Sequence, residues 1–262
     1  MNFLSLWKRL DIAPLVGFAL GGLCIAWTLM GEGGKLSAFV STHAFLVVVG
    51  GSFGASLVAI RSQDVASLLR VLPALLGTDS EARQRLATYL IGCARVARNE
   101  SHLRLEASVD KAEEPALGRG LQLLVDGLGG DFISQVFELE KERERKIYQA
   151  AEKFFDSLGG FCPTFGIVGT VMSLVGVLGH LNRPEMLAQG VAEAFIATFY
   201  GVLFANMVFL PLAMRVNRIA QDRLETLDMI LVGLLAIERL EHPTLMLERL
   251  QVYLGPVRPA DE

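Results

Sequence analysis

Residues 157–182 read SLGGFCPTFGIVGTVMSLVGVLGHLN and contain no Asp, Glu, Lys or Arg. A helix needs about 20 apolar residues to cross the hydrocarbon layer of a membrane, and this stretch supplies them. Its centre, PTFGIVGT at residues 163–170, also holds a proline, two glycines and two threonines. A helix that only anchors the chain has little use for these residues, so the stretch predicts a membrane helix with a further role.

Three more stretches lack formal charge in the same way, at residues 12–31, 36–60 and 194–214. Hydrophobic residues make up 52% of the chain, and nearly all of its charge lies between the second and third stretches or after the fourth. The first stretch ends in WTLM rather than in a small-x-small cleavage site, which favours a retained span over a signal peptide. The sequence therefore predicts an all-α membrane protein with four transmembrane helices in a two-plus-two arrangement and a helical cytoplasmic domain.

Basic residues near the ends of the spans predict the orientation of the chain. They precede the first and third spans and follow the second and fourth. The short connections between spans one and two and between spans three and four contain only one basic residue each, Lys35 and Arg183. Both termini and the long middle segment are therefore expected in the cytoplasm. The expected segments are a cytoplasmic N-terminus (1–11), transmembrane helices at 12–31, 36–60, 157–182 and 194–214, a cytoplasmic helical domain (61–156) and a cytoplasmic helical tail (215–262).

Helical periodicity extends through the cytoplasmic segments. Residues 80–99 predict a helix that Ser80 caps, and residues 115–127 predict a second helix. Residues 131–158 are dense in strong helix formers and in Glu–Lys and Glu–Arg pairs, and no proline or glycine interrupts them. We expect this helix, and the one that continues from the fourth span, to project into the cytoplasm and to pack on each other.

The four uncharged stretches hold no acidic residue, and Glu193 lies only at the outer edge of the fourth. A cation that crosses a membrane needs a carboxylate or a set of oxygen ligands at depth, because desolvating a charge is costly. The polar side chains at depth are hydroxyls and amides, namely Thr164, Thr170, Ser173, Thr198, Tyr200 and Asn206. Each alone is typical of ordinary helix packing, but Pro163 and Pro211 beside them also free backbone carbonyls. Together they predict one wall of a polar path whose carboxylate comes from a second chain.

At these residues the chain resembles the MotA/PomA family, the A subunits of the bacterial flagellar motor stator. PTFGIVGT (163–170) resembles the family's PAxGxIGT segment, while ATFYG (197–201) and ANMVFLP (205–211) resemble its TTLYG and SNMVFxP. In the cytoplasmic segments, LVDG (124–127) resembles MLVDG, and GLLAIE followed by His242-Pro243 resembles the tail GxLAIxxGxxP. The resemblance covers nearly the whole chain.

The resemblance implies a homopentameric ring of such chains around a dimer of a single-span B subunit of the MotB/PomB type, in the bacterial inner membrane. The membrane aspartate of the B subunit binds the permeating ion, Na⁺ or H⁺, and is the carboxylate that this chain lacks. Ion passage then drives the ring against the switch-complex protein of the rotor, which produces torque for motility. Beyond the transported ion, the resemblance implies no cofactor and no tightly bound metal.

The family's functional positions carry over to single residues as expectations. Thr170 and Thr198 would face the aspartate of the B subunit along the ion path. Thr170 resembles sodium-driven members, whereas several proton-driven members carry Ala there and some keep Thr, so sodium is favoured and H⁺ stays open. The residues expected to shape the channel and its conformational changes are Pro163, Pro211, Gly169, Tyr200 and Asn206.

The expected rotor contact lies in the cytoplasmic domain. Residues 97–107 read ARNESHLRLEA and resemble the family's ARKxGxLALEE, in which Arg98 and Glu106 keep the spacing of the rotor-contact residues. Asn99 and Ala107 replace a commonly basic and a commonly acidic position, and the usual glycine is absent. The contact is therefore expected to extend to other charges. Without the resemblance, Arg98 and Glu106 would be taken as a solvated surface pair.

Three alternatives stay open. The first is a stator-like ion-driven motor subunit of a non-flagellar system, such as an ExbB/TolQ-like energiser, a gliding motor or a defence complex. ExbB/TolQ chains place one span before their large cytoplasmic region, where this chain places two. The second is a membrane scaffold without an ion path. An enzyme is least favoured, because no nucleophile–base set, phosphate loop or metal-ligand spacing appears, and the cysteines are expected to be free thiols. No basic stripe predicts nucleic-acid binding.

Overall fold

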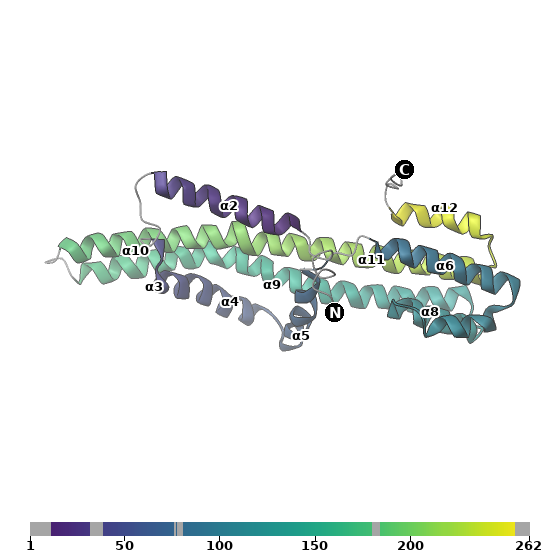
Figure 1. Cartoon of the computed structure of the whole chain (residues 1–262). Coiled ribbons are helices and arrows are strands. Elements are labelled where there is room, and N and C mark those ends of the chain that lie inside the picture. The colour runs from purple at the N-terminus through teal and green to yellow at the C-terminus, as the bar shows by residue number, and fades with distance from the viewer. Residues whose placement is uncertain (1–11, 32–38, 76, 78–80, 180–183, 255–262) are drawn as a thin grey trace. The chain divides into compact units, whose positions relative to one another are not determined.

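The computed structural model describes residues 12–31, 39–75, 77, 81–179 and 184–254 of the chain. The secondary-structure elements in these ranges are all helices (Figure 1), as the sequence predicts. They form two compact units. The first unit is built from the described parts of residues 1–78 and 147–219, and the second from those of residues 79–146 and 220–262.

Apolar helices dominate the first unit. Its elements are α2 (Ile12–Gly31), α3 (Thr42–Phe45), the π-helix η2 (Leu46–Gly50), α4 (Gly51–Ala59), α5 (Ser62–Val71), the 3-10 helix η3 (Leu72–Leu75), α10 (Pro184–Leu203), the π-helix η5 (Phe204–Phe209), and parts of α9 (Gly130–Leu178) and α11 (Leu210–Glu238). By length and composition, three of the described helices can cross a membrane, within Thr42–Ala59, Gly130–Leu178 and Pro184–Glu238. A shorter apolar helix, Pro14–Thr28, lies in α2.

Close aromatic packing holds the first unit together. The Phe53 ring of α4 meets the rings of Phe154 in α9 and Phe209 in η5 edge to face, with centroids 5.8 and 6.0 Å apart. Such edge-to-face pairs are favoured because the positive edge of one ring meets the negative face of the other. Leu158 and Cys162 of α9 are fully buried in the same cluster. Helix α4 therefore packs on α9 and η5 through large side chains.

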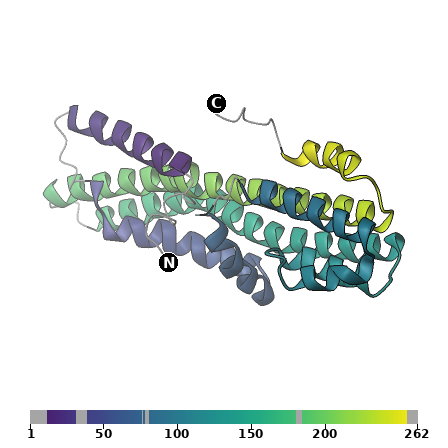
Figure 2. The same cartoon turned by 45° about the vertical axis from the view of Figure 1, so that its right-hand side comes forward.

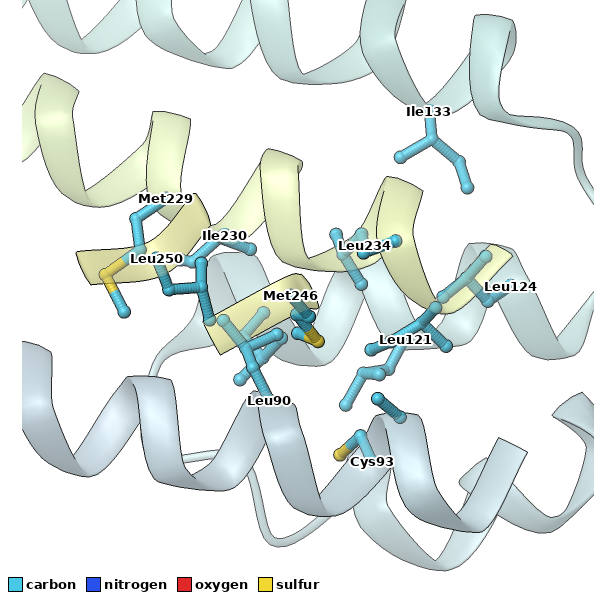
Figure 3. Close-up of a cluster of buried hydrophobic side chains, with 14 of the residues drawn as sticks. Leu90, Cys93, Leu121, Leu124, Ile133, Met229, Ile230, Leu234, Met246 and Leu250 are labelled. Carbon is cyan, nitrogen blue, oxygen red and sulfur yellow. The ribbon is translucent and has the colours of Figure 1, made fainter. Parts of the chain in front are cut away.

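The second unit has its own hydrophobic core. Its elements are α6 (Ala82–Asn99), the 3-10 helix η4 (His102–Leu105), α7 (Glu106–Val109), α8 (Pro115–Val125), α12 (Pro243–Leu254) and the remaining parts of α9 and α11. Figure 3 shows that α6, α8, α9, α11 and α12 all contribute to this core, through Leu90, Cys93, Leu121, Leu124, Ile133, Met229, Ile230, Leu234, Met246 and Leu250. The last helix, α12, is thus an integral part of the core.

The two long helices α9 and α11 contribute to both units (Figures 1 and 2). In the second unit, Lys141 of α9 pairs with Asp228 of α11 at 2.7 Å. In the first unit, Asn217 of α11 donates to Glu152 of α9 at 2.8 Å. Polar contacts therefore join the two helices within each unit, in line with the expectation that the long helices pack on each other.

Two helix ends show left-handed residues. Gly127, with φ of 77°, follows α8, and the amide of Leu128 donates to the carbonyl of Leu123. The sequence predicts a helix over 115–127, but the regular part of α8 ends at Val125 because this glycine closes it. Leu240, with φ of 52°, closes the end of α11 in the same left-handed conformation, which strains an L residue with a side chain. The predicted cap Ser80 lies outside the described residues, and α6 begins at Ala82.

Candidate functional site

The candidate site begins where α9 and α10 touch through glycine. A Cβ atom built on Gly201 would lie 2.7 Å from the Cys162 carbonyl oxygen and 3.1 Å from the Cα atoms of Pro163 and Gly166. A Cβ on Gly166 would lie 3.1 Å from the Ala197 carbonyl oxygen. These neighbours are backbone atoms, so a larger residue would force the two helices apart. Small residues allow this kind of close helix approach in a membrane.

This close approach brings Thr170 of α9 and Thr198 of α10 together. Their hydroxyl oxygens are 2.6 Å apart, so the two residues predicted for the ion path form a hydrogen bond with each other. The Thr170 oxygen also lies 2.9 Å from the Ala194 carbonyl and 3.0 Å from the Gly166 carbonyl. Thr170 is half-buried and Thr198 is exposed.

The donors and acceptors of the Thr170 and Thr198 hydroxyls determine which oxygen lone pairs remain free to bind an ion. Each hydroxyl has one proton and two lone pairs. The Ala194 and Gly166 carbonyls can only accept, so the Thr170 proton goes to one of them and the Thr198 proton goes to Thr170. The exposed Thr198 oxygen then keeps its lone pairs free toward the outside of the helix pair. A hard cation takes oxygen ligands of this kind.

Pro163 and Gly169 both serve the packing of α9. Pro163 lies inside the continuous helix, half-buried, and its Cα belongs to the crossing, 3.1 Å from a Cβ built on Gly201. A Cβ on Gly169 would lie 2.8 Å from the Ala197 Cβ and 3.5 Å from Val47 in η2. Gly169 therefore allows α9 to approach α10 and η2 together.

Pro211 and Asn206 lie at a π-helical segment. The π-helix η5 (Phe204–Phe209) comes directly before α11, whose second residue is Pro211, and a proline has no amide to give to the regular helix pattern. Asn206 is exposed, and its side-chain amide donates to the Val202 carbonyl one turn earlier at 2.9 Å. The sequence predicts both residues as channel-shaping but gives no sign of the π-helix, which depends on a shifted hydrogen-bond register.

Tyr200 does not join the threonine pair. Its hydroxyl donates to the Phe39 carbonyl at 2.6 Å and accepts from the Ser41 amide at 3.3 Å. These hydrogen bonds join α10 to the residues just before α3, which Ser41 caps. Thr164 also stays apart, because its hydroxyl donates to Phe161 of its own helix at 2.7 Å.

A cavity of about 390 Å³ lies beside the crossing, between α3, η2, α9 and α10. Gly169 and Ala197 form part of its wall, and His43 and Glu193 line it together with smaller polar residues. His43 and Glu193 lie far apart in the chain, so no sequence pattern predicts that they line the same cavity. The side chain of Gln189 donates to Glu193 at 3.4 Å within this cavity.

The two predicted rotor-contact residues belong to the second unit. Arg98 is in the last turn of α6, Glu106 is the first residue of α7, and both are exposed. They form no ion pair within the described residues. The threonine pair belongs to the first unit, so the two predicted sites are in separate parts of the chain.

The chain is similar to known proteins in sequence and in fold. The sequence model of the MotA/TolQ/ExbB proton channel family matches residues 108–229. Motility protein A of Treponema phagedenis is 28% identical over 94% of this chain and 95% of its own, and the chemotaxis protein PomA of Vibrio alginolyticus is 27% identical over 97% and 99%. In fold, the chain is similar to a protein in the structure of C. jejuni MotAB, with a TM-score of 0.88 and 24% identity over 95% of this chain and 98% of that one. Over most of its length the chain is therefore similar in sequence to the MotA and PomA motility proteins.

Proposed function

We infer that the chain is the A-type subunit of a flagellar motor stator, which converts cation flow into torque together with a B subunit. The observation that carries this inference is the contact of the Thr170 and Thr198 hydroxyls at 2.6 Å, between two apolar helices. The names of the relatives support it, because they include motility protein A and PomA. The work of such a subunit is transport and torque rather than catalysis.

In this proposal the chain supplies neutral oxygen atoms and the B subunit supplies the charge. Thr198 offers its free lone pairs on the exposed side of α10, and Thr170 holds it in place by accepting a hydrogen bond from its hydroxyl. A carboxylate that approached Thr198 from another chain would complete a set of oxygen ligands for a cation. The close crossing at Gly201 keeps the two hydroxyls at a fixed separation.

The same proposal includes the assembly and the membrane topology. Four spans, at 12–31, 36–60, 157–182 and 194–214, cross the bacterial inner membrane with both termini in the cytoplasm. Five chains surround a dimer of B subunits. The domain at 61–156 contacts the switch-complex protein of the rotor through Arg98 and Glu106, and the tail at 215–262 supports it. The two glycine-mediated contacts of α9 with its neighbours favour the compact packing that such a ring needs.

The identity of the ion depends on Thr170 in this proposal. A hydroxyl oxygen can ligate Na⁺, whereas a proton needs only the carboxylate and a water or hydroxyl relay. We propose sodium as the driving ion, with the proton as the alternative. Thr170→Ala removes the oxygen that orients Thr198, and should reduce sodium-driven motility more than proton-driven motility.

The function can be tested by complementation. A stator-deleted flagellated cell is given this chain with the gene for a single-span B subunit beside it, and swimming is measured in sodium-free and sodium-rich media. Swimming that returns only in sodium supports a sodium-driven stator, and swimming in both media supports protons. A well-expressed pair that leaves the cells immotile argues against the flagellar function and favours an energiser of a non-flagellar system.

A further inference from the structure

Glu193 places a carboxylate in an apolar helix of the first unit. It lies in α10, part of the helix Pro184–Glu238 that is long and apolar enough to cross a membrane, and it is half-buried. Its oxygen Oε1 accepts from the Gln189 side-chain amide at 3.4 Å, but within the described residues the carboxylate forms no ion pair. An ionisable side chain in such a helix is costly unless it is paired, and it marks a candidate ion site. Glu193 therefore needs a cation that the described residues do not supply.

The cavity of about 390 Å³ gives this carboxylate a place to hold a ligand. Among the described residues that line the cavity, Glu193 is the only Asp, Glu, Lys or Arg. The Gln189 carboxamide and the Ser173 hydroxyl line it as well, and their oxygens accept no hydrogen bond within the described parts of the chain. The cavity thus combines one negative charge with neutral oxygen atoms from both α9 and α10.

Close helix packing fixes the walls of the cavity. A Cβ atom built on Gly190 of α10 would collide with the Val177 side chain of α9. Further along the two helices, a Cβ on Gly169 would lie 2.8 Å from the Ala197 Cβ. The Tyr200 hydroxyl adds hydrogen bonds to the residues just before α3, which forms another wall. The walls are therefore in place before a ligand arrives, which lowers the cost of binding.

The chemistry of these donors favours a hard monovalent cation. Hard cations take oxygen ligands, and tight sites for divalent Ca²⁺ use several carboxylates, whereas this cavity has one. The cavity of about 390 Å³ is also much larger than a bare ion, because one water molecule takes only about 30 Å³. The ion therefore keeps part of its hydration shell and is bound weakly. Conduction requires such a site, which an ion can both enter and leave.

We propose that the cavity is a loading site for the driving Na⁺, in which Glu193 attracts the ion and Gln189 and Ser173 supply neutral ligands. The inference rests on the proposed stator function, in which the start of α10 faces outward. Glu193 then lies between the outer end of α10 and Thr198 of the ion path. The site is separate from the threonine pair, because neither threonine lines the cavity. A negative charge in a cleft raises the local cation concentration and the rate of arrival.

The test compares three variants in the full A–B complex. Glu193→Gln removes the charge at nearly unchanged size, Glu193→Asp keeps the charge, and Glu185→Gln is the matched control. Glu185 is an exposed carboxylate in the first turn of the same helix, but it does not line the cavity. Uptake of Na⁺ by membrane vesicles is measured against Na⁺ concentration at constant pH, so that the protonation of Glu193 and His43 does not vary.

Glu193→Gln should raise the Na⁺ concentration for half-maximal uptake about tenfold, which corresponds to about 1.4 kcal/mol, and should affect the rate at saturating Na⁺ less. Glu193→Asp should shift this concentration less than Glu193→Gln does, and Glu185→Gln should not shift it. A second readout does not need transport: the melting temperature of the purified complex in sodium chloride and in N-methylglucamine chloride of equal ionic strength. Na⁺ that binds the folded state raises the melting temperature, and Glu193→Gln should reduce this rise while Glu185→Gln keeps it.

The outcomes separate the loading site from the proposed function. If the unchanged complex takes up Na⁺ and Glu193→Gln reaches half-maximal uptake at the same concentration, the loading site is overturned while the stator function stands. Equal shifts in Glu193→Gln and Glu185→Gln would also overturn it, because the effect would then come from general surface charge. An effect of Glu193→Gln that follows pH but not Na⁺ would assign a proton to Glu193 instead. If the unchanged complex neither takes up cations nor restores swimming, the proposed function fails, and the melting temperatures still decide whether Glu193 binds Na⁺.

Discussion

Replacing Gly201 by alanine should disrupt the crossing of α9 and α10. The new Cβ would lie 2.7 Å from the Cys162 carbonyl oxygen, where ordinary contacts begin near 3.4 Å, so the helices must separate by about 0.7 Å (3.4 minus 2.7). The obstructing atoms are backbone and cannot rotate away. Because Thr198 lies one turn from Gly201, the 2.6 Å contact between Thr170 and Thr198 should lengthen or break.

The magnitude follows from comparison with Gly160→Ala. A Cβ on Gly160 meets nothing within 4 Å. Both variants gain the same helix propensity, about 1 kcal/mol, so their difference isolates the overpacking cost of about 1–3 kcal/mol. The assay is denaturant unfolding of the purified complex, together with swimming of a stator-deleted cell. We expect Gly201→Ala to be less stable than Gly160→Ala and poorly motile. If the two variants unfold alike and swim alike, the close crossing does not hold the threonine pair.

Three further predictions concern the second unit. Burial alone lowers the pKa of Lys141, but hydrogen bonds and charges from Asp228 and Glu138 outweigh it and raise that pKa above its ordinary value of 10.5. The stabilisation of the folded unit by these contacts of Lys141 is therefore complete below the ordinary pKa and is lost as pH rises through the raised pKa. Denaturant unfolding measured from about pH 9 to 12 should show this loss of stability, and Lys141→Met should remove this pH dependence. Burial raises the pKa of the Cys93 thiol, so maleimide at pH 8 should label it only after unfolding; rapid labelling of Cys93 in folded protein whose exposed Cys24 is replaced by serine would contradict its burial. Leu240→Gly should stabilise the unit by about 0.5–1 kcal/mol, because a left-handed leucine costs about 1–2 kcal/mol and glycine loses part of that gain to chain entropy. A lower melting temperature for Leu240→Gly would show that its side-chain contacts outweigh the backbone strain.

The helices could be predicted from the sequence because a run of apolar residues without charge leaves few other structures. Residues 12–31 form α2 over the same bounds, and the dense helix formers before the third span continue into α9 without a break at Gly159 or Pro163. The tail motif of the family places a glycine at the position of Leu240, and the left-handed conformation there gives the physical reason. Local pattern and helix geometry were sufficient for these helices, whereas the left-handed conformation of Leu240 was not predicted.

The arrangement of the candidate site could be predicted only in part. Thr170 and Thr198 could be singled out one by one, but their direct contact depends on how closely Gly166 and Gly201 allow the helices to approach. The π-helix η5 depends on a register of backbone hydrogen bonds that no side-chain pattern encodes. The cavity lined by His43 and Glu193 joins residues whose separation in the chain hides their proximity.

The central claim is that the hydroxyl pair forms one wall of a cation path completed by a second chain. The most direct measurement is cation uptake by membrane vesicles that contain this chain with its B subunit, for the unchanged chain, Thr198→Ala and Thr164→Ala. Thr164 is the matched control, because its hydroxyl is bonded to Phe161 of its own helix. We expect Thr164→Ala to conduct like the unchanged chain and Thr198→Ala to conduct about tenfold less, as loss of about 1.4 kcal/mol at the limiting step implies. Equal uptake in all three, at equal amounts of complex, would contradict the claim.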